Sequence, residues 1–117
     1  MAISGAHIIV FSSDPDADRE FFTDVLEYPH VDAGHGWLIF KLPPAELAVH
    51  PSDTSTAHEL YLTCDDLEET TASLRARGVT LDEATDEPWG RLTGFVLPGG
   101  SKVGLYQPFH PRATELD

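Results

Sequence analysis

Apolar and polar positions follow two different periods in this chain, and the two periods occur twice in the same order. Residues 3–11 form an apolar run typical of a strand that is covered on both faces, and residues 57–63 form a second run of the same kind. A short polar, acidic link follows each run, and a segment with apolar residues at helical spacing follows each link. The pattern predicts a strand and then a helix in each half of the chain.

The signals for the first half are clearest at its helix. Asp14 can cap exposed helix amides and Pro15 suits a first turn, so the helix is expected to begin there. It should end before Pro29, which disfavours helical geometry in the preceding residue. Strands are then expected at 37–42 and 46–50, and their closeness in sequence predicts a hairpin between them.

The second half carries the same signals. Its helix is expected to begin after Asp65 or Asp66, either of which can act as the cap, and to end at Gly78 in the left-handed position. A short strand at 79–81 and a hairpin of 92–97 with 102–107 should follow. The predicted inner stripe of the helix is Leu67, Thr71 and Leu74.

The repeated order implies a unit of one strand, one helix and three strands that occurs twice. The two Ala-His pairs, which end at His7 and His58, and the two Leu-Pro pairs at 42–43 and 97–98 recur at nearly the same separation. We therefore expect an α+β fold in a single domain, residues 1–117. Its first module is expected at 1–51, its second module at 57–108 and a tail at 109–117.

Composition narrows the classes of protein that remain. A chain of 117 residues with 41% hydrophobic residues can bury a core without disulfides. Its one cysteine, Cys64, excludes an intramolecular disulfide scaffold and a site of several thiolates, and we interpret it as structural. No stretch resembles an export signal or a membrane span. A protein of the reducing cytoplasm is expected.

The charge of the chain argues against nucleic acid as a partner. The formal net charge is −13, and only seven Lys and Arg are scattered along the sequence without a basic stripe. Such a surface repels phosphate backbones. No nucleic-acid and no membrane partner is therefore expected, and the acidic excess is interpreted as a solvated surface.

The order and spacing of three features carry a resemblance to a known family. They are the Ala-His openings, the loop Pro88-Trp89-Gly90-Arg91 and the closing stretch 95–105. The chain resembles the vicinal oxygen chelate (VOC) superfamily, which includes glyoxalase I, extradiol dioxygenases and bleomycin-resistance proteins. The resemblance covers nearly the whole chain. It implies two βαβββ modules whose mixed sheet curls into a cup, and it implies a homodimer whose cups are built within one chain or across two.

In metal-dependent members of that superfamily, His and Glu from four strands hold one divalent ion. The resemblance places His7 and His58 at two of these positions, and it places Ala48 and Gly104 where carboxylates would be. Alanine and glycine side chains cannot coordinate a metal. The implied site is degenerate, and His7 and His58 are open to a second interpretation as histidines with a purely structural role.

A metal site would need a third ligand from elsewhere. Period-two alternation puts Glu46 and His50 on the same strand face as Ala48, so either could supply it, with Glu46 also the candidate catalytic carboxylate. A surface role is the simpler interpretation of both. The ion, if any, would be Fe, Mn, Ni or Zn.

The cup is expected to be lined by apolar and aromatic side chains. Trp89 can stack on a flat ligand, as its motif suggests by similarity to the bleomycin-resistance branch, or it can plug the end of the core. Ala48 and Gly104 would leave room for the ligand. The remaining lining residues are expected to be Ile9, Phe11, Leu60, Leu62 and Tyr106.

Two functions from different classes follow. In the first, the protein binds a small organic, aromatic compound in the cup, and the degenerate metal site plays no part. In the second, it is a divalent-metal-dependent lyase or dioxygenase that uses His7 and His58 with Glu46 or His50. The missing carboxylates favour the first. The sequence leaves open whether the protein is an enzyme, and whether the cup is instead filled by its own side chains.

Overall fold

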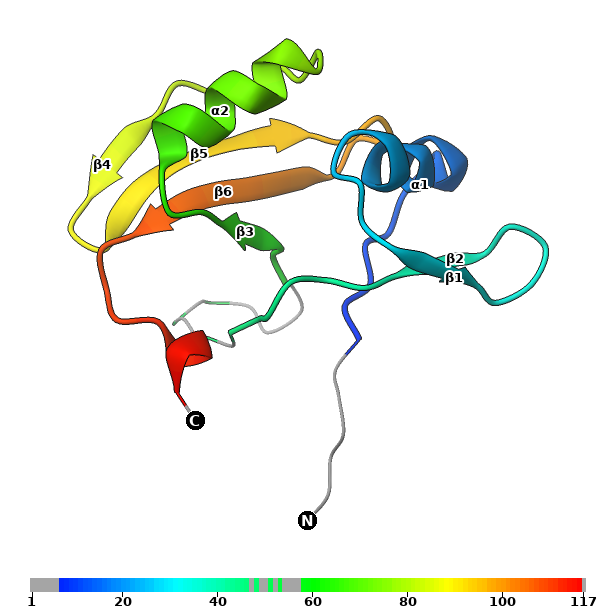
Figure 1. Cartoon of the computed structure of the whole chain (residues 1–117), viewed down its shortest axis with the longest axis horizontal. Helices are drawn as coiled ribbons and strands as arrows, with labels where there is room; N and C mark the ends of the chain where they lie inside the picture. The colour runs from blue at the N-terminus through cyan, green and yellow to red at the C-terminus, as the bar shows by residue number, and fades with distance from the viewer. Residues whose placement is uncertain (1–6, 47, 49–50, 52, 54–57, 117) are drawn as a thin grey trace.

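The computed structural model describes residues 7–46, 48, 51, 53 and 58–116, and it confirms an α+β fold (Figure 1). The described residues form two α-helices and six strands. Four of the strands form one sheet, and the other two form a separate hairpin. In chain order the elements are α1 (Pro15–Asp24), β1 (His30–Asp32), β2 (Leu38–Phe40), β3 (Tyr61–Thr63), α2 (Leu67–Ala76), β4 (Thr85–Glu87), β5 (Gly90–Val96), β6 (Lys102–Pro108) and a 3-10 helix (Ala113–Glu115).

The second half of the chain builds the larger sheet. Its strand order is β3-β6-β5-β4, with β3 parallel to β6 and the other pairs antiparallel. Along the chain these elements run strand, helix and three strands, which is the order that the repeat pattern predicts. Helix α2 covers one face of the sheet, and no α-helix of the described residues covers the opposite face, called here the open face (Figure 1).

The core lies between α2 and the sheet. Asp66 caps α2, because its carboxylate accepts a hydrogen bond from Glu69 N at 3.1 Å, and Gly78 takes a φ of 88° just after the helix. The predicted stripe of α2 is buried. The apolar core consists of Leu67, Leu74, Phe95, Leu97, Val103 and Leu105.

Helix α1 packs against the same core from the first half of the chain. Asp14 caps it as predicted, accepting from Ala17 N at 3.2 Å. The ring of Phe21 lies 5.5 Å from that of Phe95. The buried Asp18 accepts a hydrogen bond from Gly99 N at 2.7 Å, which ties α1 to the turn between β5 and β6. The two halves therefore share one packed unit.

The hairpin of the first half differs from the prediction. Strand β2 pairs with β1 at residues 30–32, a segment expected to be irregular, and not with Glu46 or Ala48, the described residues of the expected partner strand. Asp32 accounts for this, because its carboxylate accepts from Gly34 N at 2.8 Å and from Gly36 N at 3.3 Å and so closes the turn between the strands. Residues 47, 49 and 50 lie outside the described part of the chain.

Two expected strands are not observed. Residues 7–11 belong to neither sheet, and Phe11 is 86% exposed; residues 3–6 of that expected strand lie outside the described residues. Residues 79–81 form no ladder, although Val79 and Leu81 pack against the core, and the acidic loop after them forms β4 instead. Apolar periodicity reports burial, whereas a strand also needs a neighbour to pair with. Within the described chain, the two sheets do not close into a cup.

Candidate functional site

The open face of the sheet is shaped by a close contact between β3 and β6. The strand register places Tyr61 opposite Gly104. A Cβ atom added at Gly104 would collide with the ring of Tyr61, so the ring lies directly over the glycine. Tyr61 is 42% exposed, because this face has no helix to cover it.

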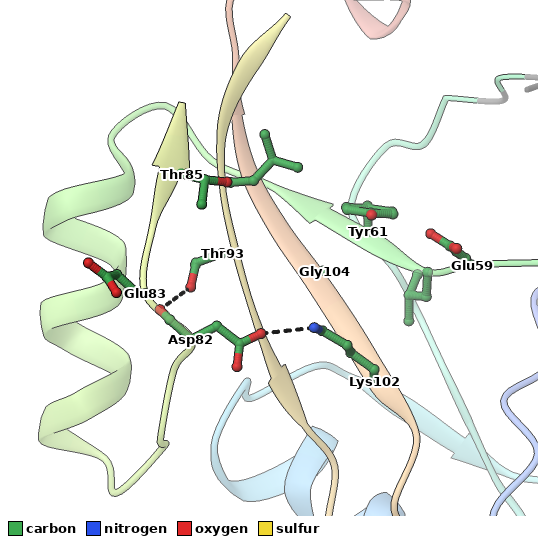
Figure 2. Close-up of a pocket in the computed structure, with 10 residues that line it drawn as sticks. Glu59, Tyr61, Asp82, Glu83, Thr85, Thr93, Lys102 and Gly104 are labelled. Carbon is green, nitrogen blue, oxygen red and sulfur yellow. Dashed lines mark hydrogen bonds and ion pairs between the residues drawn. The ribbon is translucent and has the colours of Figure 1, made fainter. Parts of the chain in front are cut away.

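A pocket of about 500 Å³ lies on this face, and we call it the sheet pocket. Figure 2 shows Glu59 and Tyr61 on the β3 side, Asp82 and Glu83 on the β4 side, and Lys102 between them. Leu60, Thr85, Leu92, Thr93 and Gly104 complete the lining. The size matches that of sites for small organic ligands.

The charged residues of the pocket include one ion pair. Lys102 Nζ lies 3.0 Å from Asp82 Oδ2, and this hydrogen bond to the carboxylate raises the pKa of the Lys102 ammonium (Figure 2). Thr93 Oγ1 donates to Asp82 O at 2.6 Å and holds the backbone of the loop against β5. Asp82 is thus fixed to both strands of the β5–β6 hairpin.

The phenol of Tyr61 faces an acidic environment. Burial raises the pKa of Tyr61, and the nearby Glu59 carboxylate raises it further, because both disfavour a phenolate. Tyr61 therefore carries its proton at neutral pH. In the sheet pocket it offers a flat ring, whose hydroxyl group is hydrogen-bonded to the Glu59 side chain.

Three aromatic rings lie in a row beside the pocket. Trp89, in the turn between β4 and β5, stands edge-to-face with Tyr106 at 5.4 Å, and Tyr106 stands edge-to-face with Tyr61 at 5.8 Å. Trp89 is 40% exposed, so part of its indole is open to solvent. We call these three residues the aromatic row. Burial, and secondarily the Glu46 carboxylate, raises the pKa of Tyr106.

The residues predicted to line the cup lie in several environments. Leu60 and Gly104 line the sheet pocket, whereas Leu62 packs against the core under α2. Phe11 is 86% exposed and Ile9 is 64% exposed, and neither lines this pocket. Ala48 is also exposed and lies outside the pocket lining.

The predicted metal ligands do not form a site within the described residues. His7 and His58 are exposed, and Glu46 accepts a hydrogen bond from Ala113 N in the C-terminal segment. No three His, Cys, Asp or Glu side chains gather suitably for a metal in the part of the chain that is described, and His50 lies outside that part. The donors present do not fit the divalent metal centre of the enzymes that the chain resembles.

Glu59, Tyr61, Asp82, Glu83 and Lys102 line the pocket but were not among the predicted residues. Glu59 and Tyr61 could have been found by counting positions back from the two helix caps. Measured back from the caps Asp14 and Asp66, the counterpart of His7 is Glu59 and not His58. The repeated Ala-His pair is therefore one residue out of step with the structural repeat, and alternation along β3 then places Glu59 and Tyr61 on the open face.

Cys64 follows β3, where its thiol lies 3.7 Å from Tyr106 O. Burial is the main cause of a raised pKa for this thiol, which disfavours the reactive thiolate. No helix in the described residues is long and apolar enough to cross a membrane.

Solved structures with this fold include proteins of different kinds. TnmS3, an antibiotic binding protein from Streptomyces sp. CB03234, is 28% identical over 92% of this chain and 98% of its own, with a TM-score of 0.68. A glyoxalase/bleomycin resistance protein from the same organism is 27% identical over 82% of this chain and 93% of its own, with a TM-score of 0.55.

A lactoylglutathione lyase from Agrobacterium tumefaciens shares the fold at a TM-score of 0.64. It is 16% identical over 92% of this chain and 96% of its own. No curated protein matches the chain significantly. The family model of the glyoxalase/bleomycin resistance protein/dioxygenase superfamily matches residues 5–108. The chain belongs to this superfamily, which is the VOC superfamily that its sequence resembles.

Proposed function

We propose that this protein binds a small, flat organic molecule in the sheet pocket and acts as a binding protein. The observation that carries the proposal is a pocket of about 500 Å³ on a sheet face without a helix, with the Tyr61 ring exposed above Gly104. Aromatic rings bind flat apolar ligands through burial and stacking. The similarity to TnmS3, which is described as antibiotic binding, supports the same class of function.

Trp89 and Tyr106 extend the proposed binding surface. The aromatic row continues from Tyr61 to Trp89 without a break, so a ligand longer than one ring can reach from the pocket onto the indole. Leu60 and Gly104 are proposed as further contacts, because both line the pocket. Catalysis is not part of this proposal, since Ala48 and Gly104 lack donor atoms and the described residues do not fit the metal site.

Titration with the neutral probe anthracenylmethanol, followed by its fluorescence anisotropy, tests the function. Saturable binding is expected. Tyr61→Ala and Trp89→Ala should each weaken it by roughly five- to a hundredfold, the range measured for loss of aromatic stacking. The matched control is Trp37→Ala, since Trp37 is also exposed, at 63%, but lies in the β1–β2 hairpin region.

The titration has two outcomes against the proposal. No saturable binding would overturn the proposed function. Equal losses for Trp89→Ala and Trp37→Ala would remove the aromatic row from the site. Elemental analysis of the protein purified without a metal-affinity tag tests the alternative of a metal-dependent enzyme. Stoichiometric Fe, Mn, Ni or Zn that is lost in His7→Ala and His58→Ala would favour that alternative.

We also propose that the protein is a homodimer whose binding cup is completed by a second copy of the chain. Residues 7–11 carry apolar side chains of a strand but belong to neither sheet, and Phe11 is 86% exposed. Among the described residues, strand β3 is an edge of its sheet and pairs with β6 alone. Apolar surface and an unpaired strand edge favour association, and two copies can cover both.

A further inference from the structure

The charges around the sheet pocket point to the chemical class of its ligand. Glu59, Asp82 and Glu83 contribute three carboxylates, and Lys102 contributes the one cation among the lining residues. With each of these groups ionised, the lining has an excess of two negative charges. An organic anion entering this pocket would meet repulsion at short range, whereas a cation would meet attraction.

The single cation of the lining is already engaged. Lys102 Nζ lies 3.0 Å from Asp82 Oδ2, so the charge of the ammonium is offset by the carboxylate that it contacts. Neither Glu59 nor Glu83 forms an ion pair with a side chain of the described residues. Neither carboxylate is therefore neutralised by a cation in this part of the chain, and Figure 2 shows that of Glu83 pointing away from Tyr61 and Lys102.

Glu59 is the better placed of the two. It lies beside Tyr61, where burial and then the Glu59 carboxylate raise the pKa of a phenol that is already neutral at pH 7. The face of a neutral phenol ring attracts cations, and the Tyr61 ring is exposed over Gly104. The ring and the carboxylate together form a surface that suits a flat molecule with a positively charged group at its edge.

We propose that the ligand of the sheet pocket is an organic cation, a protonated amine or amidine attached to a flat body, with Glu59 as the main residue that selects the charge. This proposal rests on the proposed binding function. The flat body lies against Tyr61, and the cationic group lies toward Glu59, with Glu83 adding to the field from the β4 side.

Three probes of one ring system and different charge test the proposal: anthracenylmethylammonium, anthracenylmethanol and anthracenecarboxylate. We expect the cation to bind about tenfold more tightly than the alcohol at low salt, and the carboxylate to bind more weakly than either. Raising the salt to about 0.5 M should reduce the preference for the cation to about twofold or threefold.

Variants separate the pocket charges from the field of the whole chain, which has a formal net charge of −13 and attracts cations generally. Glu59→Gln together with Glu83→Gln should weaken the ammonium probe about tenfold and leave the alcohol within about twofold. The matched control is Glu20→Gln together with Asp24→Asn. It removes the same charge from exposed positions of α1, outside the pocket, and should change neither probe by more than about twofold.

Each result decides a different claim. Equal affinity of the ammonium and alcohol probes would overturn the charge preference and leave the proposed binding function intact. An equal loss in the pocket variant and the α1 control would also overturn it, because the preference would then come from net charge alone. If no probe binds, the proposed function fails and the charge preference fails with it.

Discussion

At the scale of single residues, Gly104 has the largest influence on the candidate site. The resemblance to metal-dependent proteins draws attention to Gly104 as the position of a lost carboxylate. The structure adds that the absence of a side chain lets the Tyr61 ring lie against the backbone of β6. The glycine therefore supplies no metal donor and leaves room for an aromatic ring on the open face.

Gly104→Ala is expected to lower the free energy of unfolding by about 1–3 kcal/mol, because the added methyl group collides with the Tyr61 ring and forces it to move. Urea denaturation followed by circular dichroism measures the change. The control is the same substitution in a Tyr61→Ala background, where the cost should fall below about 0.5 kcal/mol. An equal cost in both backgrounds would show that Tyr61 is not what limits space at Gly104.

At the scale of elements, both helix starts follow from local chemistry, whereas strand pairing does not. Asp14 and Asp66 cap their helices as predicted, because a cap needs only a side chain and the amides two or three residues later. The hairpin of β5 and β6 was also predicted, since its two strands are close in sequence. The pairing of β1 with β2 was missed, because it depends on a turn closed by Asp32 within a segment of weak apolar signal.

Adjacent residues of β5 test the assignment of the two sheet faces. Phe95 is 1% exposed and packs against α1, whereas Val96 is 61% exposed on the open face. Phe95→Ala should cost about 3–5 kcal/mol of unfolding free energy, and Val96→Ala should cost less than about 0.5 kcal/mol. Thermal and urea denaturation of both variants measure the difference. Similar losses would contradict the division into a packed face and an open face.

At the scale of the whole molecule, the two halves share a core but do not enclose a cup within the described chain. Helix α1 and the β5–β6 turn are joined by Asp18 and by the contact of Phe21 with Phe95. The β1–β2 hairpin extends away from the four-stranded sheet (Figure 1), and residues 7–11 belong to neither sheet. Exposed apolar side chains on both, among them Phe11 and Val31, lack cover from the described part of this chain.

The proposed homodimer predicts a mass of twice the 12.8 kDa chain in size-exclusion chromatography with light scattering. Phe11→Asp should shift the protein toward the monomer, because a charge cannot be buried unpaired in an apolar interface. Leu116→Asp is the matched control, since it places the same charge on a side chain that is 78% exposed near the C-terminus. A monomeric wild-type protein would contradict the proposal, and so would a dimer that Phe11→Asp leaves intact.

The sequence by itself determined the order of elements in the second half, the two capped helices, the β5–β6 hairpin and membership of the superfamily. These features depend on residues close together in the chain or on their order. Only the tertiary structure decided which face of β3 meets the pocket, because a shift of one residue exchanges the two faces of a strand. The Ala-His repeat indicated the side of the strand that carries His58, Leu60 and Leu62, whereas the register with β6 places Tyr61 over Gly104. Glu59 and Leu60 line the same pocket as Tyr61.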